Sequence, residues 1–126
     1  DHHALWINPD NTNILYLGTD GGVYFSLDRG VTWKFCNNLP VGQFYHVSVD
    51  AQEPYRIYGG LQDNGSWYAP SAVPGGVLNG DWKSVFGGDG FWVQPDAFDA
   101  SLVYAEAQGG TMARINMKNG TTVSIK

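Results

Sequence analysis

The chain has 126 residues, of which 17 are glycine, 14% are aromatic and only 15% are charged, so its composition excludes a long helical architecture and favours many short strands. The formal net charge of −5 argues against nucleic acid and anionic membranes as partners, because both select basic surfaces. No apolar run approaches the roughly 20 residues that are needed to cross a bilayer as a helix.

The first repeating unit extends from residue 3 to about residue 35. Four short strands are predicted in it, over residues 4–7, 14–17, 23–25 and 33–35. The segment Asn8-Pro9-Asp10-Asn11 has the composition of a turn, and Thr19-Asp20-Gly21-Gly22 has that of a loop. Together they predict four antiparallel strands joined by tight connections.

The connection between the third and fourth strands of this unit carries the most specific motif of the chain. Residues 26–33 read Ser-x-Asp-x-Gly-x-Thr-Trp. Oxygen atoms of Ser26 and Asp28 can accept backbone N–H bonds inside the turn, and Gly30 permits a backbone conformation that side chains resist. We expect Trp33 to begin the return strand and to bury its apolar ring. The motif positions predicted to be structural are Ser26, Asp28, Gly30, Thr32 and Trp33.

Two further units repeat the same order of strands and turns. The second covers about residues 44–86, and a Pro/Gly-rich segment over residues 70–80 replaces the Ser-x-Asp motif. The third covers about residues 91–125 and contains a decayed copy of the motif over residues 116–123, in which Gly120 and Thr122 are retained. The chain is therefore predicted to contain three related units.

The spacing of the units predicts propeller blades. Tyr16, Tyr58 and Tyr104 hold the same position in their units and are separated by 42 and 46 residues. Four-stranded blades repeat at about 40–50 residues, and a closed propeller needs about 4–8 of them. We therefore predict an all-β fold in which residues 1–126 form a single partial propeller of three four-stranded antiparallel blades. The rest of a longer parent, or a second copy of the chain, would complete the ring.

Large aromatic side chains at strand positions are expected to form the core between neighbouring blades. They are Trp6, Tyr16, Tyr58, Trp67, Trp82, Trp92 and Tyr104.

The motif at residues 26–33 resembles the Asp-box of the BNR-repeat propellers, a family that includes sialidases, xyloglucan-degrading hydrolases and sortilin-type receptors. The repeats extend the resemblance over nearly the whole chain. The run Gly-Gly-Leu-Gln-Asp-Asn-Gly at residues 59–65 is most similar to bacterial sortilin-like and glycosyl-hydrolase-like members. The resemblance implies that the Asp-box is structural and that a carbohydrate or peptide ligand binds elsewhere. Sialidase chemistry would need an arginine cluster, and only Arg29, Arg56 and Arg114 occur.

Blade topology places the Asp-box at one end of the strands and two acidic glycine-rich loops at the opposite end. Asp63 lies in the loop over residues 59–65, and Asp89 lies in Gly87-Gly88-Asp89-Gly90. Each aspartate could simply cap a turn, or the two could form an acidic pair that faces a ligand. The Asp63 loop loosely resembles loops of xyloglucan-degrading propellers in which a carboxylate is catalytic. The accompanying ligand-binding candidates are Gln62, Asn64, Trp67, Tyr68 and Gln108.

These observations leave several functions open. The chain could be a binding module for a glycan or peptide, part of a glycoside hydrolase in which Asp63 and Asp89 are the candidate catalytic carboxylates, or a structural segment. No cofactor is expected, and no metal site is expected, because the adjacent His2 and His3 would point to opposite faces of a strand. The start at Asp1 without a signal peptide suggests a fragment or processed product, and the family resemblance favours a secreted or periplasmic location.

Overall fold

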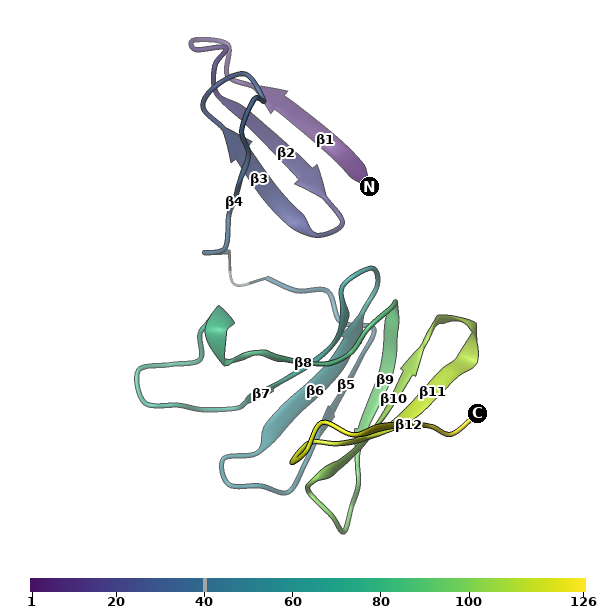
Figure 1. The fold of residues 1–126 in the computed structure, drawn as a ribbon. Coiled ribbons are helices and arrows are strands. Elements are labelled where there is room, and N and C mark those ends of the chain that lie inside the picture. Colours follow the sequence, from purple (N-terminus) through teal and green to yellow (C-terminus); the bar gives the residue numbers. More distant parts are fainter. Residues whose placement is uncertain (40) are drawn as a thin grey trace. The chain divides into compact units, whose positions relative to one another are not determined.

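The computed structural model describes residues 1–39 and 41–126. They form an all-β protein of three four-stranded antiparallel sheets, as predicted, and in each sheet the strands are neighbours in chain order (Figure 1). The chain divides into two compact units, Asp1–Leu39 and Pro40–Lys126. The first unit contains one sheet and the second contains two.

Sheet A forms the first unit. Its strands are β1 (His2–Ile7), β2 (Leu15–Thr19), β3 (Gly22–Ser26) and β4 (Lys34–Phe35). Side chains alternate across the sheet, so Trp6, Tyr16 and Phe25 form an aromatic row on one face, with ring centroids 5.8 and 6.2 Å apart. The opposite face carries Leu5, Leu17, Tyr24 and Phe35, and the rings of Tyr24 and Phe35 have centroids 5.1 Å apart.

Sheets B and C form the second unit. Sheet B contains β5 (His46–Val49), β6 (Arg56–Leu61), β7 (Gly65–Pro70) and β8 (Lys83–Phe86). Sheet C contains β9 (Gly90–Pro95), β10 (Leu102–Ala107), β11 (Thr111–Asn116) and β12 (Thr122–Ser124). Two short 3₁₀ turns, η1 (Asn79–Asp81) and η2 (Gln108–Gly110), lie in the connections. The strands agree with the predicted units to within a few residues.

The core of the second unit lies between sheets B and C. One cluster joins Tyr58 of sheet B to Val93 and Val103 of sheet C, and all three side chains are at most 1% exposed. A second cluster extends this contact along sheet C; it contains Ala105, Ala113 and Ile115. Burying side chains of this size contributes about 1.5–3 kcal/mol each, so this interface dominates the stability of the unit.

The predicted aromatic core is only partly present. Tyr58 is completely buried, as expected. Trp6 and Tyr16 lie in strands of sheet A as predicted and pack on each other, with ring centroids 5.8 Å apart. Within the second unit, Trp92 is 46% exposed and stacks on His46, with ring centroids 4.2 Å apart, so it is not part of the buried core there. Trp82 lies just before β8 and packs on Phe44, with ring centroids 5.5 Å apart.

Glycines allow sheets B and C to approach closely. A Cβ added to Gly60 would lie within 3 Å of the backbone of Gly90 and Phe91. A Cβ added to Gly90 would likewise lie within 3 Å of Gly65. Only residues without side chains fit where these backbones meet.

The turn over residues 26–33 has the hydrogen bonds that its sequence predicts. Ser26 Oγ accepts from the backbone N–H of Gly30 at 2.8 Å, and Asp28 Oδ1 accepts from that of Thr32 at 2.8 Å. Gly30 has a φ of 86°. One expectation is corrected: Trp33 precedes β4 instead of beginning it, and its ring is 38% exposed and lies over Gly30.

The decayed copy of this turn keeps part of the same network. Asn116 Oδ1 accepts from the N–H of Lys118 at 3.0 Å, as Ser26 Oγ accepts from that of Asp28 at 3.2 Å. Gly120 has a φ of 72° and donates its N–H to the carbonyl of Asn116. An asparagine can therefore replace the serine, because both supply an acceptor two residues before the N–H that needs it.

Candidate functional site

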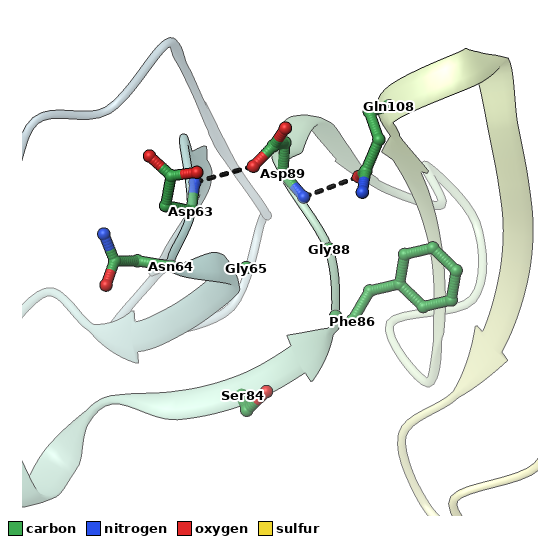
Figure 2. A pocket seen from close by; sticks show the side chains of 9 residues that line it. Asp63, Asn64, Gly65, Ser84, Phe86, Gly88, Asp89 and Gln108 are labelled. Atoms are coloured by element: carbon green, nitrogen blue, oxygen red, sulfur yellow. Dashed lines mark hydrogen bonds between the residues drawn. The ribbon is translucent and has the colours of Figure 1, made fainter. Parts of the chain in front are cut away.

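Three loops of the second unit meet at one end of sheets B and C. They join β6 to β7, β8 to β9 and β10 to β11, and each contributes one polar residue from the predicted set: Asp63, Asp89 and Gln108. Figure 2 shows these residues side by side, linked by two hydrogen bonds. The sequence therefore correctly placed the three residues at the same end of the strands.

The turn geometry of the β6–β7 loop directs the backbone N–H of Asp63 toward the β8–β9 loop. Asp63 has a φ of 60°, a left-handed conformation that aspartate and asparagine tolerate better than most residues. Its backbone N–H donates to Oδ1 of Asp89 at 2.8 Å. One carboxylate of the predicted acidic pair is thus bonded to the backbone of the other residue.

Two hydrogen bonds join Asp89 and Gln108, and each residue donates one of them. The N–H of Asp89 donates to Oε1 of Gln108 at 2.6 Å, and the N–H of Gln108 donates to the carbonyl of Asp89 at 3.2 Å. Gly88 has a φ of 83°, and a Cβ there would lie 2.5 Å from Oε1 of Gln108. The glycine is therefore needed so that the amide can lie against the loop.

The three loops surround an open pocket of about 430 Å³. Its lining residues are Asp63, Asn64, Gly65, Ser84, Phe86, Gly87, Gly88, Asp89 and Gln108. The pocket combines carboxylate acceptors with amide and hydroxyl groups that can both donate and accept. Such a surface suits a ligand that carries many hydroxyl groups.

The other predicted ligand-binding residues support the loop or the core instead of lining the pocket. Gln62 accepts a hydrogen bond from the Tyr45 hydroxyl. The indole N–H of Trp67 donates to the carbonyl of Asn64 at 2.5 Å, which fixes the end of the loop. Tyr68 stacks on Tyr58 with ring centroids 5.5 Å apart and packs against the buried cluster. Only Asn64 and Gln108 of that set line the pocket with the two aspartates.

Sequence reasoning did not assign Ser84 and Phe86 to the site. Both lie in β8, but Phe86 is opposite Ser66 and Ser84 is opposite Trp67, so a bulge interrupts the alternation of side chains between them. Strand alternation in the sequence could not have identified this pair, because the bulge arises from the register of β8 against β7.

The first unit has its own polar contact near the start of the chain. His3 Nε2 pairs with Oδ1 of Asp20. Hydrogen bonding, first from His3, lowers the pKa of Asp20 below its ordinary value. Among the residues that the structure describes, no group of three or more His, Cys, Asp or Glu side chains could hold a metal ion. Nor is any helix in the described part of the chain long and apolar enough to span a membrane.

The chain was compared with protein-family profiles, curated proteins and solved structures, and none of them matched.

Proposed function

We propose that this chain is a three-blade segment of an Asp-box β-propeller that binds a neutral carbohydrate at the Asp63–Asp89 pocket. Three four-stranded sheets with successive strands adjacent support the propeller assignment, as does the face-to-face packing of sheet B on sheet C. The hydrogen-bonded turn around Asp28 adds the family's signature. Within the second unit, the pocket lies at the end of sheet C opposite the decayed copy of the turn, which joins β11 to β12.

The observation that carries the proposal is the linkage of Asp63, Asp89 and Gln108 across three loops. These two hydrogen bonds hold the three loops in one arrangement, so the polar groups of the loops are preorganised around a single pocket. Sugar hydroxyls can donate to the carboxylates and can accept from the amide groups. The net charge of −5 disfavours acidic sugars, which leaves neutral glycans as the best match.

Two isosteric variants test the assignment. Asp63→Asn keeps a residue that tolerates a φ of 60°, and Asp89→Asn keeps an oxygen that can accept the N–H of Asp63. Each variant therefore removes a negative charge while the loop stays intact. Hydrogen bonds to charged groups contribute about 1.5–3 kcal/mol, so we expect each variant to weaken glycan binding by about 10-fold or more.

Binding is measured by calorimetry against a panel of neutral oligosaccharides. Asp10→Asn is the matched control, because Asp10 is an exposed acid in the β1–β2 turn and its replacement changes the net charge equally. Unchanged affinity in both pocket variants would contradict the proposal. So would saturable binding of a peptide panel without any binding of oligosaccharides.

Glycoside hydrolysis is the second candidate, favoured by the presence of two carboxylates in the same pocket. Glycosidases use a pair of carboxylates about 5–5.5 Å apart for retention or about 6.5–9.5 Å apart for inversion. This candidate predicts release of reducing sugar and its loss in either asparagine variant. Binding without turnover would leave the binding function alone.

A further inference from the structure

Two segments of the second unit match the acceptor pattern for N-linked glycosylation, in which an asparagine is followed two residues later by serine or threonine. They are Asn64-Gly65-Ser66, between β6 and β7, and Asn119-Gly120-Thr121, between β11 and β12. Modification of a folded protein requires the asparagine amide and the hydroxyl of the third residue to lie at the surface. The structure separates the two segments on this criterion.

Folding closes the first segment. Ser66 lies in β7, which pairs with β6 on one side and with β8 on the other, and its side chain is completely buried. Its Oγ lies against β9, because a Cβ added to Gly90 would be 2.6 Å away from it. The amide nitrogen of Asn64 donates to the carbonyl of Gln62 at 2.9 Å. An enzyme could reach the Ser66 hydroxyl only if sheets B and C separated.

The second segment is open within the second unit. Asn119, Gly120 and Thr121 are all exposed. Oδ1 of Asn119 accepts the backbone N–H of Thr121 at 2.9 Å, so the asparagine side chain bends toward the third residue of the pattern. Within the described part of the chain, no hydrogen bond engages Nδ2 of Asn119 or the hydroxyl of Thr121. The turn therefore presents the acceptor nitrogen and the hydroxyl together.

The turn is closed by bonds that a modification of Asn119 would not break. The N–H of Asn116 donates to the carbonyl of Thr121 at 2.8 Å, and the N–H of Gly120 donates to the carbonyl of Asn116 at 2.8 Å. Neither bond uses the side chain of Asn119. The turn also lies at the end of sheet C opposite the pocket, so a glycan attached there leaves the pocket accessible (Figure 1).

We propose that Asn119 is an acceptor site for N-linked glycosylation of the folded chain, and that Asn64 is not. In the transfer, Nδ2 of Asn119 forms a bond to the anomeric carbon of an oligosaccharide carried on a polyprenyl diphosphate. The bond between that carbon and the diphosphate oxygen breaks, and the lipid diphosphate leaves. One proton of the amide passes to a base of the transferase, and the asparagine nitrogen remains an amide.

The test incubates the folded full chain with a single-subunit oligosaccharyltransferase and a lipid-linked oligosaccharide. Peptides that span residues 60–70 and 114–124 are the unfolded references. We expect both peptides to be modified, whereas the folded chain gains a single glycan, located at Asn119 by mass spectrometry of proteolytic fragments. Thr121→Val should abolish the transfer, because it removes the hydroxyl and keeps the size, and Thr121→Ser should retain it. Asn64→Gln is the control and should leave the modification of Asn119 unchanged.

Near-ultraviolet circular dichroism checks that every variant keeps its fold, and Thr121→Ala replaces a Thr121→Val protein that does not. A folded chain that receives no glycan at Asn119 would overturn the proposal. Transfer to Asn64 in the folded chain as rapid as in its peptide would also overturn it, because burial of Ser66 would then not limit the reaction. No step of this test involves ligand binding at the pocket, so its failure is distinguishable from failure of the proposed function.

Discussion

The hydroxyl of Tyr58 donates a hydrogen bond to Oδ2 of Asp50 at 3.0 Å, which anchors the turn between β5 and β6 to the buried face of sheet B. Arg56 Nε donates to the same oxygen at 2.6 Å, and the Arg56 guanidinium also donates to the carbonyl of Ala100, in the connection between β9 and β10, at 2.9 Å. Burial raises the pKa of Asp50, but hydrogen bonds, first from Arg56, outweigh it and leave that pKa below its ordinary value. Asp50 thus joins the turn to the core of sheet B, and Arg56 extends the link to the β9–β10 connection.

The first prediction concerns this link. Tyr58→Phe should lower the free energy of unfolding of the second unit by about 1–3 kcal/mol, because it removes a hydrogen bond to a buried charged group while the ring remains. Urea denaturation measures the loss. Tyr104→Phe serves as the comparison, since its hydroxyl makes the corresponding bond to Asp96 at 3.2 Å from a half-buried position, and its effect should be smaller. Equal effects would show that burial does not set the strength of this bond.

The second prediction concerns the close approach of sheets B and C. Gly60→Ala should destabilise the second unit by about 1–3 kcal/mol, because the added methyl group meets backbone atoms of Gly90 and Phe91, which cannot rotate away. Gly80→Ala is the matched control, because a Cβ at Gly80 meets nothing within 4 Å and Gly80 has no left-handed φ. Thermal unfolding of both variants distinguishes a steric effect from a general cost of replacing glycine. A Gly60→Ala protein as stable as the control would refute the close packing.

The third prediction is a pH dependence of the Ser26–Thr32 turn. Hydrogen bonds, first from the hydroxyl of Thr32, then from its backbone N–H, lower the pKa of Asp28 from 3.8 to about 2. Because the folded pKa is the lower one, the stabilisation is complete above the unfolded value and is lost as the pH falls through about 2. In Thr32→Val the carboxylate loses the hydroxyl donor, so the pKa of Asp28 should rise toward 3.8.

Carbon-detected NMR titration of the Asp28 carboxyl measures that pKa directly. The stability difference between wild type and Thr32→Val should be constant at about pH 5 and above and should shrink as the pH falls toward 2. Asp10→Asn provides a control for the general loss of negative charge. A stability difference that does not change with pH would mean that the hydroxyl does not act through the Asp28 carboxylate.

Local interactions explain why much of the architecture could be predicted. The bonds that close the Asp28 turn join residues at most four positions apart, so the sequence motif contains all of their partners. The regular spacing of Tyr16, Tyr58 and Tyr104 likewise follows from one strand order repeated three times. Placing Asp63, Asp89 and Gln108 at one end of the strands required only the up-and-down order of the strands.

The tertiary structure determines which side chains are buried and which are exposed. Tyr58 and Tyr104 are the same residue at the same position, yet only Tyr58 is covered, because sheet C packs on its side of sheet B. Tyr68 packs against the Tyr58 cluster, whereas Phe86 packs against the Ala105 cluster and also lines the pocket, although both are aromatic residues of sheet B. The sequence by itself determined the strands and turns, since those depend on near neighbours. The burial of a side chain and the set of residues that line the pocket depend on packing between strands that are distant in the sequence. Only the tertiary structure shows which strands pack together.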